Sequence, residues 1–178
     1  MPEVHMVGTI NGAQNIPFSK VYLHWKVVMD EDNWSILGGK NEGCSQIDAT
    51  ENSFEVIWNH PIDIHFSTTL IEGWPKLILE VWRLDLYDRH EIAGYGCLAL
   101  PAAPGRHELA AAVWRPLGGW AARLKAFLLG GSAQARYSEE FLLGSQRHNL
   151  RTESLGFVTL SLQVITHSFE QHGAYLGS

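Results

Sequence analysis

The stretch WNHPIDIHF, residues 58–66, alternates apolar and polar side chains from its proline onward. Alternate residues of a β-strand share a face, so this pattern predicts a strand with one apolar and one polar face. The residues predicted to face a core are Ile62, Ile64 and Phe66. Asp63 and His65 point outward together. Pro61 has no N–H to donate to a sheet, so we expect it to start the strand or to lie at a bulge.

The two outward residues raise the question of a metal site. Zinc needs at least three protein ligands, and this strand brings only Asp63 and His65 together. His60 would face the core if the strand ran that far. The sequence therefore predicts no metal site here and favours a surface pair that is either solvated or in contact with a protein partner.

The same period of two recurs along the chain and indicates the fold class. The predicted strands cover residues 4–10, 20–29, 43–48, 54–58, 62–68, 76–84, 94–100 and 156–167. Gly and Pro separate them, Gly94 and Gly96 indicate a bulge, and no strand–helix alternation suggests a parallel sheet. We expect an all-β antiparallel sandwich with one short helix, forming a single domain over residues 1–170 with a tail at 171–178.

The helix is predicted at about residues 119–129. Its apolar side chains recur at helical spacing, at Trp120, Leu124, Phe127 and Leu128. Residues 131–150 carry the weakest pattern, and we expect a long loop there. The apolar face of the helix either caps its own sandwich or joins Trp114 and Arg115 in a partner-binding surface, since Trp and Arg dominate interface hot spots.

Composition narrows the function classes. The formal net charge of −6 argues against nucleic-acid binding and against broad attraction to anionic lipid. The chain opens without a basic segment followed by an apolar one, and no apolar run approaches the roughly 18–20 residues of a membrane span, so we expect neither a signal peptide nor a membrane helix. Cys44 and Cys97 are expected to be reduced thiols of a cytosolic protein.

Catalytic motifs are missing from the sequence. It contains no G-x-S-x-G, G-x-x-x-x-G-K or H-E-x-x-H pattern, and its nine histidines are scattered. We therefore expect no enzyme activity, no cofactor and no small-molecule substrate.

Two acidic loops are the candidates for calcium, which takes about 6–8 oxygen ligands from clustered carboxylates. Asp85 and Asp88 follow one predicted strand, and Asp30, Glu31 and Asp32 follow another. Whether the two loops meet depends on the fold. Solvated turn acids are the favoured interpretation, which leaves Asp85 and Asp88 as weak calcium candidates only.

Two segments resemble the C2 superfamily of β-sandwiches. WNHPIDI is similar to that family's W-N-E-x-F-x-F strand, and LEVWRLDLYDRHEIAGYG, residues 79–96, is similar to its L-x-x-x-V-W-D-x-D loop and the strand that follows. Arg83 stands where the pattern has its first aspartate, and Asp85 matches the second. GAQNIPFSKVYLHWKV falls where the family carries its D-P-Y-V loop, and it has no aspartate. The resemblance implies a C2-like frame whose calcium site is lost, because a cation replaces a ligand carboxylate.

Six segments in order also resemble the B9-domain family of ciliary proteins. They are EVHMVGTINGA, WNHPIDIHF, GWP at 73–75, AGYG at 93–96, LPAAPGRHEL and WRPLG. The resemblance covers about residues 3–169, nearly the whole chain.

The B9 resemblance implies a non-enzymatic role. Proteins of this family belong to the Meckel-syndrome-associated complex at the ciliary transition zone, which links the axonemal base to the membrane and gates entry into the cilium. Three B9-domain proteins assemble there, with one bridging the other two. The chain is then expected to be a cytoplasmic scaffold subunit at the transition zone and basal body, required for cilium assembly, with two other B9-domain proteins as partners.

An alternative is a peripheral membrane module that binds phospholipid through loops at one end of the sandwich, with weak calcium dependence or none. A possible basic cluster favours it, formed by Arg106, His107, Arg115, Arg123 and Lys125. For the scaffold role, the predicted partner-binding residues are Asp63, His65, Trp114, Arg115, Trp120, Leu124 and Phe127.

Overall fold

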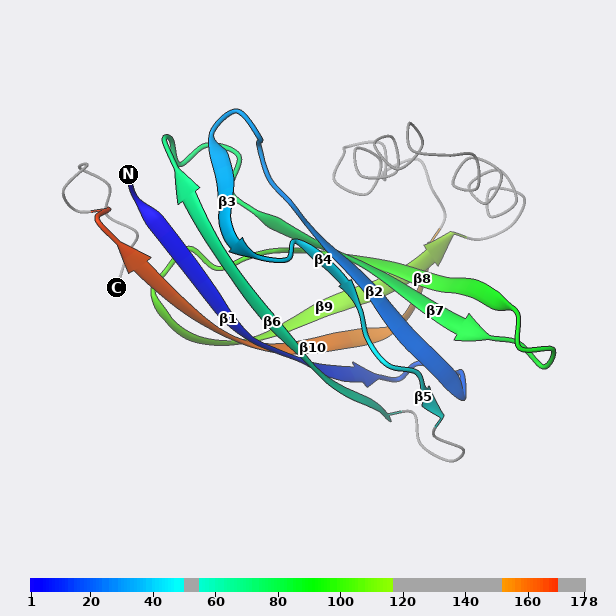
Figure 1. The fold of residues 1–178 in the computed structure, drawn as a ribbon. Helices are drawn as coiled ribbons and strands as arrows, with labels where there is room; N and C mark the ends of the chain where they lie inside the picture. The colour runs from blue at the N-terminus through cyan, green and yellow to red at the C-terminus, as the bar shows by residue number, and fades with distance from the viewer. Residues whose placement is uncertain (50–54, 117–151, 170–178) are drawn as a thin grey trace.

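The computed structural model describes residues 1–49, 55–116 and 152–169 (Figure 1). The predicted helix at 119–129, the predicted loop at 131–150 and the tail at 171–178 lie outside these residues. The described strands are β1 (Glu3–Gln14), β2 (Lys20–Val28), β3 (Trp34–Gly39), β4 (Glu42–Cys44), β5 (Asp48–Ala49), β6 (Glu55–Thr68), β7 (Lys76–Leu84), β8 (His90–Ala99), β9 (Gly105–Pro116) and β10 (Thr152–His167).

The strands form one antiparallel sheet that curls into two layers (Figure 1). The hydrogen-bonded order is β3-β6-β1-β10-β9-β8-β7-β2-β4, and β5 pairs with β2. β9 pairs with β10 from Gly105 to Pro116 but with β8 only at Val113 and Trp114. The sheet therefore divides into a first layer of β3, β6, β1, β10 and β9 and a second layer of β8, β7, β2, β4 and β5. The predicted all-β antiparallel sandwich is confirmed for the described residues.

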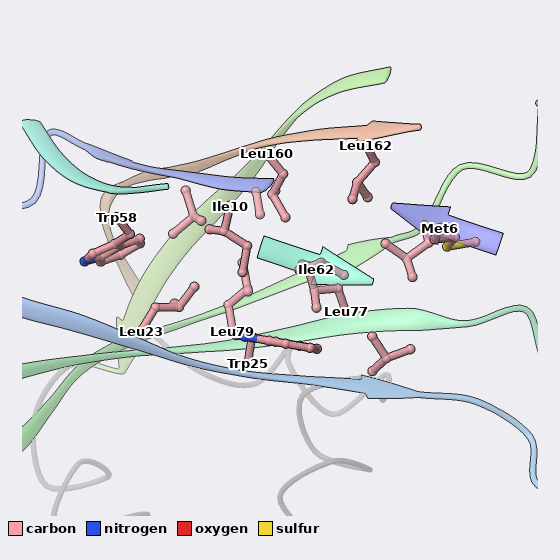
Figure 2. Close-up of a cluster of buried hydrophobic side chains, with 14 of the residues drawn as sticks. Met6, Ile10, Leu23, Trp25, Trp58, Ile62, Leu77, Leu79, Leu160 and Leu162 are labelled. Atoms are coloured by element: carbon pink, nitrogen blue, oxygen red, sulfur yellow. The ribbon is translucent and has the colours of Figure 1, made fainter. Parts of the chain in front are cut away.

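Apolar side chains from both layers meet between them and form the core (Figure 2). The first layer contributes Met6, Ile10, Trp58, Ile62, Leu160 and Leu162, and the second contributes Leu23, Trp25, Leu77 and Leu79. None of these side chains is more than 4% exposed. Burying one Leu or Ile side chain stabilises a fold by about 1.5–3 kcal/mol, so the core holds the layers face to face and leaves the polar side chains on two outer faces.

The strand that contains WNHPIDIHF is longer than predicted. The sequence predicts separate strands at 54–58 and 62–68, whereas β6 runs without a break from Glu55 to Thr68. A bulge lets the strand pass its proline: Asn59 has a φ of 46°, and the register with β1 shifts between Ile57 and His60. The predicted core face is confirmed, since Ile62, Ile64 and Phe66 are 4%, 1% and 0% exposed.

Pro61 follows this bulge at a place where β6 has no described strand on its other side. β3 pairs with β6 only between Ile64 and Thr68. The Asp63 carbonyl faces β3, since a Cβ added to Gly39 would lie 2.0 Å from its oxygen. Pro61, two residues earlier, presents its backbone to the same side. Its missing N–H therefore costs no ladder hydrogen bond, as expected of a proline beside a bulge.

Two strands are absent from the sequence prediction. β3 has six residues, of which the last two are glycines, so its alternating pattern is short. β9 contains three consecutive alanines, which lack the β-branched or aromatic side chains typical of strands. Its alternation depends on Ala111 and Val113, which are 1% and 0% exposed. Because core-facing side chains of this strand are small, a search for alternating large apolar residues misses it.

Two smaller features refine the prediction. The strand expected at 43–48 is divided into β4 and β5, because Ser45 exchanges hydrogen bonds with the Leu23 backbone through its own N–H and its Oγ. The predicted bulge in β8 is confirmed, since the register with β7 shifts between Val81 and Trp82 beside Gly94. A Cβ at Gly94 would lie 2.8 Å from the Val113 side chain, so the strands approach closely there.

Candidate functional site

The register of β1 against β6 gathers polar side chains on the outer face of the first layer. His5 of β1 lies directly opposite His65 of β6, and Val7 lies opposite Asp63. Glu3 is two residues before His5 and therefore shares its face. The predicted outward pair of Asp63 and His65 thus meets two polar residues of a strand that lies more than fifty residues away in the sequence.

These four side chains form two linked contacts, here called the histidine–carboxylate network (Glu3, His5, Asp63 and His65). His5 Nε2 lies 2.7 Å from Asp63 Oδ1, and His65 Nε2 lies 3.1 Å from Glu3 Oε2. The two imidazole centroids are 5.1 Å apart. A carboxylate only accepts hydrogen bonds, so each histidine donates from a protonated Nε2.

The network contributes little to stability and is open to contact from outside. Its side chains are 35–69% exposed, and exposed ion pairs are worth about 0–1 kcal/mol. Two exposed apolar side chains adjoin it: Val7 is 37% exposed, and Ile165, opposite His5 on β10, is 51% exposed. A mixed polar and apolar face on rigid strands suits protein contact.

Glu3 and His5 are the members of the network that sequence analysis missed. The alternation in residues 4–10 indicates a strand with an outward face, and this places His5 on that face. Nothing in the sequence states which strand pairs with β1 or in which register. The meeting of His5 with His65 is therefore a product of topology rather than of a motif.

Trp114 and Arg115, the other predicted partner-binding residues within the described part, have different surroundings. Trp114 is 7% exposed and packs with Ile78 and Tyr95 in a cluster separate from the main core. Its ring lies 5.7 Å from that of Tyr95, and burial raises the pKa of the tyrosine. Arg115 Nε donates to Glu153 Oε2 over 2.9 Å. Trp120, Leu124 and Phe127 lie outside the described residues.

The basic cluster proposed for lipid contact does not form among its described members. Arg106 and Arg115 stand nine positions apart on β9, or roughly 30 Å at the rise of an extended strand. Each is paired with a carboxylate, Arg106 with Glu108 and Arg115 with Glu153. Their charges are therefore separated along the strand and balanced locally.

The loop between β7 and β8 contains the calcium candidates, and its carboxylates are already in use. Asp85 accepts hydrogen bonds from the backbone N–H of Tyr87 and of Arg89 and from Arg89 Nε, at 2.7–3.0 Å. These contacts with Arg89, and the bond from Tyr87, lower the pKa of Asp85 to about 2. Asp88 accepts from Lys20 Nζ over 2.7 Å.

The charge of Arg83, which stands where the C2 pattern has its first aspartate, is also neutralised. Arg83 Nη2 lies 2.9 Å from Glu91 Oε2, and its guanidinium lies 4.4 Å from the Phe18 ring centroid. The other acidic loop, with Asp30, does not approach this one. It follows the end of β2 that pairs with the start of β7, whereas the Asp85 loop follows the far end of β7. Among the described residues, no three His, Cys, Asp or Glu side chains are arranged to hold a metal ion.

The tip of the β7–β8 loop is apolar. Leu86 is 99% exposed and Tyr87 is 80% exposed. The Arg89 guanidinium lies 5.3 Å from the Tyr87 ring centroid, in cation–π range. The loop therefore presents a leucine and a tyrosine above a base of balanced charges.

Comparison with known proteins identifies the family. A family model described as ciliary basal body-associated B9 protein matches residues 4–165. The chain belongs to this family. It is 39% identical to B9 domain-containing protein 2 of Xenopus laevis over 173 residues, which cover 97% of this chain and 98% of that protein. It is 28% identical to B9 domain-containing protein 1 of Mus musculus over 171 residues, which cover 94% and 83%.

Membership of the B9 family confirms the resemblance found in the six sequence segments. EVH, NHPID and WRPLG resemble B9 domain-containing protein 2 in particular, in agreement with the high coverage of that relative. Among solved structures, a C2 domain of a plant extended synaptotagmin 1 is similar over 91% of this chain and 92% of that chain, with 10% identity and a TM-score of 0.45. The family description indicates a cilium-related location. Within the described ranges, no helix is long and apolar enough to cross a membrane.

Proposed function

We propose that this chain is a non-enzymatic scaffold subunit that bridges two other B9-domain proteins in a transition-zone complex, where it is required for cilium assembly and gating. The observation that carries the proposal is the B9 family match over nearly the whole chain. Relatives named B9 domain-containing protein 1 and 2 also match this chain along most of their lengths, so homologous domains are available as partners.

A bridging subunit needs two separate surfaces, and the predicted partner-binding residues of the described part lie on two different strands of the sandwich, β6 and β9. We assign one partner to the outer face of β1 and β6, at Asp63 and His65. That face is exposed, sits on two paired strands and combines charge with apolar area at Val7 and Ile165. We assign the other partner to the end of β9, at Trp114 and Arg115.

Co-expression of the full chain with B9 domain-containing protein 1 and a third B9-domain protein tests the scaffold role. Size-exclusion chromatography with light scattering should give one complex that contains all three chains. Asp63→Arg should release one partner and retain the other. Glu108→Arg is the matched control, because it reverses an exposed charge on the outer face of the same layer.

The outcomes test the scaffold role and the assigned binding surface separately. Three chains that elute apart under all conditions overturn the scaffold proposal. A complex that survives Asp63→Arg as well as Glu108→Arg retains the scaffold but removes the histidine–carboxylate network from the interface.

A second candidate function, calcium-independent binding to phospholipid, is favoured by the apolar loop tip. Leu86 and Tyr87 are the most exposed large apolar residues of the described part, and aromatic side chains favour the membrane–water interface. The loop carboxylates hold Arg89 and Lys20, so calcium has no free carboxylate there to bind.

Liposome flotation tests this candidate. The double variant Leu86→Ser and Tyr87→Ser should abolish binding to phosphatidylcholine vesicles, with and without anionic lipid. Calcium and a chelator should make no difference. Leu70→Ser is the control, because Leu70 is 57% exposed in the loop at the other end of β7. Equal loss from the control variant, or no flotation of the unaltered chain, rejects this function.

A further inference from the structure

The paired histidines of the histidine–carboxylate network lie close enough together to act as ligands of one ion. His5 and His65 stand directly opposite each other on neighbouring antiparallel strands, where Cβ atoms are about 4.5–5.5 Å apart. Their rings are 5.1 Å apart and tilted by 31°. β1 is itself paired on both sides, with β6 and with β10. Both imidazoles are therefore presented by strands whose backbones are fixed.

The hydrogen bonds of the network determine which ring nitrogen is available. His5 donates from Nε2 to Asp63, and His65 donates from Nε2 to Glu3. In a neutral imidazole that donates from Nε2, the other nitrogen, Nδ1, has a free lone pair. A carboxylate bonded to the far nitrogen is also the usual support of a metal-binding histidine, because it fixes the ring and raises its basicity. The network contains this support twice.

The local charge favours a cation. The described partners of Glu3 and Asp63 are histidines, which are uncharged when deprotonated. Among the described residues, neither carboxylate forms an ion pair with a lysine or an arginine. This is the opposite of the β7–β8 loop, where Arg89 and Lys20 occupy the carboxylates.

We propose that His5 and His65 chelate one divalent transition-metal ion through their Nδ1 atoms, with Glu3 and Asp63 as supporting hydrogen-bond acceptors. Imidazole ligands select copper, nickel and zinc rather than calcium or magnesium. No third protein side chain of the described residues converges on this point, so water completes the coordination. Sequence analysis predicts no metal here because it considers only the ligands of β6, whereas the second imidazole comes from β1.

Isothermal titration calorimetry of the untagged full chain with Cu²⁺, Zn²⁺ or Mg²⁺ chloride at pH 7.5 tests the site. One equivalent of Cu²⁺ should bind, more tightly than Zn²⁺, with no binding of Mg²⁺, as the ordering of divalent metals on nitrogen ligands requires. Affinity should fall as the pH is lowered, because protons compete for Nδ1.

Variants locate the ion. His5→Gln and His65→Gln should each remove the equivalent, and Asp63→Asn should weaken affinity by about 10–100-fold, the usual effect of losing a supporting partner. His24→Gln is the matched control, since His24 also faces a carboxylate, that of Glu80, on the outer face of the second layer. Loss of the equivalent in the control, or its retention in either network variant, overturns the proposal.

Paramagnetic broadening by Cu²⁺ gives a second readout that does not depend on the stability of a variant. Amide signals of β1 and β6 around His5 and His65 should broaden first in the unaltered chain. Broadening centred on β2 and β4, around His24 and Cys44, overturns the assignment. The proposal is independent of the scaffold role, because it concerns the chain alone and its failure leaves partner binding untouched.

Discussion

The β7–β8 loop and the outer face of β1 and β6 both display carboxylates, but they use them in different ways. In the loop, Asp85 and Asp88 form ion pairs with Arg89 and Lys20. On the β1–β6 face, Asp63 and Glu3 instead contact the histidines His5 and His65. Carboxylates therefore form a closed, ion-paired loop in one place and an exposed surface of histidine–carboxylate contacts in the other.

The two regions also differ in what lies beneath them, and this gives the largest expected effect. Phe66, behind the network on β6, is fully buried against Trp34. Phe66→Ala should lower the free energy of unfolding by about 3–5 kcal/mol, because it leaves a cavity in the core. Leu86→Ala, at the exposed loop tip, should change it by less than about 0.5 kcal/mol.

Urea unfolding of both variants, followed by tryptophan fluorescence, measures this difference. Similar midpoints for Phe66→Ala and Leu86→Ala would contradict the view that the β1–β6 face is supported by the core while the loop tip is not.

The sequence predicts the buried strands beneath these surfaces more fully than it predicts the surface contacts themselves. Alternating large apolar residues give β2 and β7 nearly to the residue, and they give the core face of β6. They miss β9, whose core face uses Ala111, and they divide β6 at Pro61, where a bulge and an open edge remove the cost of a proline. Period and propensity therefore predict the longer strands whose core faces carry large side chains, and they miss β9 and the short β3.

The candidate site was predicted only on one strand. Asp63 and His65 follow from the alternation within β6, but His5 and Glu3 depend on the pairing of β6 with β1. Arg83 leads the sequence analysis to predict a lost calcium site, yet the cations that contact the loop carboxylates are Arg89 and Lys20. Pairing between distant segments is a property of the whole sheet, so local sequence reasoning supplies half of each contact.

The closed loop makes a pH prediction of intermediate size. Bonds from Arg89 and Tyr87 hold the pKa of Asp85 at about 2, below its ordinary value of 3.8. A depressed folded-state pKa stabilises the protein above the unfolded pKa and loses that contribution as the pH falls through the folded one. Asp85→Asn should therefore lower the melting temperature at pH 7, by a few degrees.

The difference between Asp85→Asn and the unaltered chain should narrow below about pH 4 and be largely lost by about pH 2. Differential scanning calorimetry of both chains between pH 2 and pH 7 measures it. A difference that stays constant over this range would mean that Asp85 acts through packing rather than through its charge.

The smallest expected effect concerns a histidine–carboxylate contact on the second layer, which is the counterpart of the two contacts on the first. His24 Nδ1 lies 3.6 Å from Glu80 Oε2, and this carboxylate raises the pKa of His24. Lys26, on the same strand, opposes the shift, and Glu42 on β4 supports it. A raised folded-state pKa stabilises the protein below the unfolded value of 6.5 and loses that contribution as the pH rises through the folded value.

His24→Gln should therefore destabilise the chain at pH 5.5 and leave it nearly unchanged at pH 8.5. Because His24 is 44% exposed, the loss at pH 5.5 should be no more than about 0.5 kcal/mol. Urea midpoints of the two chains at both pH values measure it, with Glu80→Gln expected to give the same pattern. Equal losses at both values would mean that His24 contributes by packing beside Cys44.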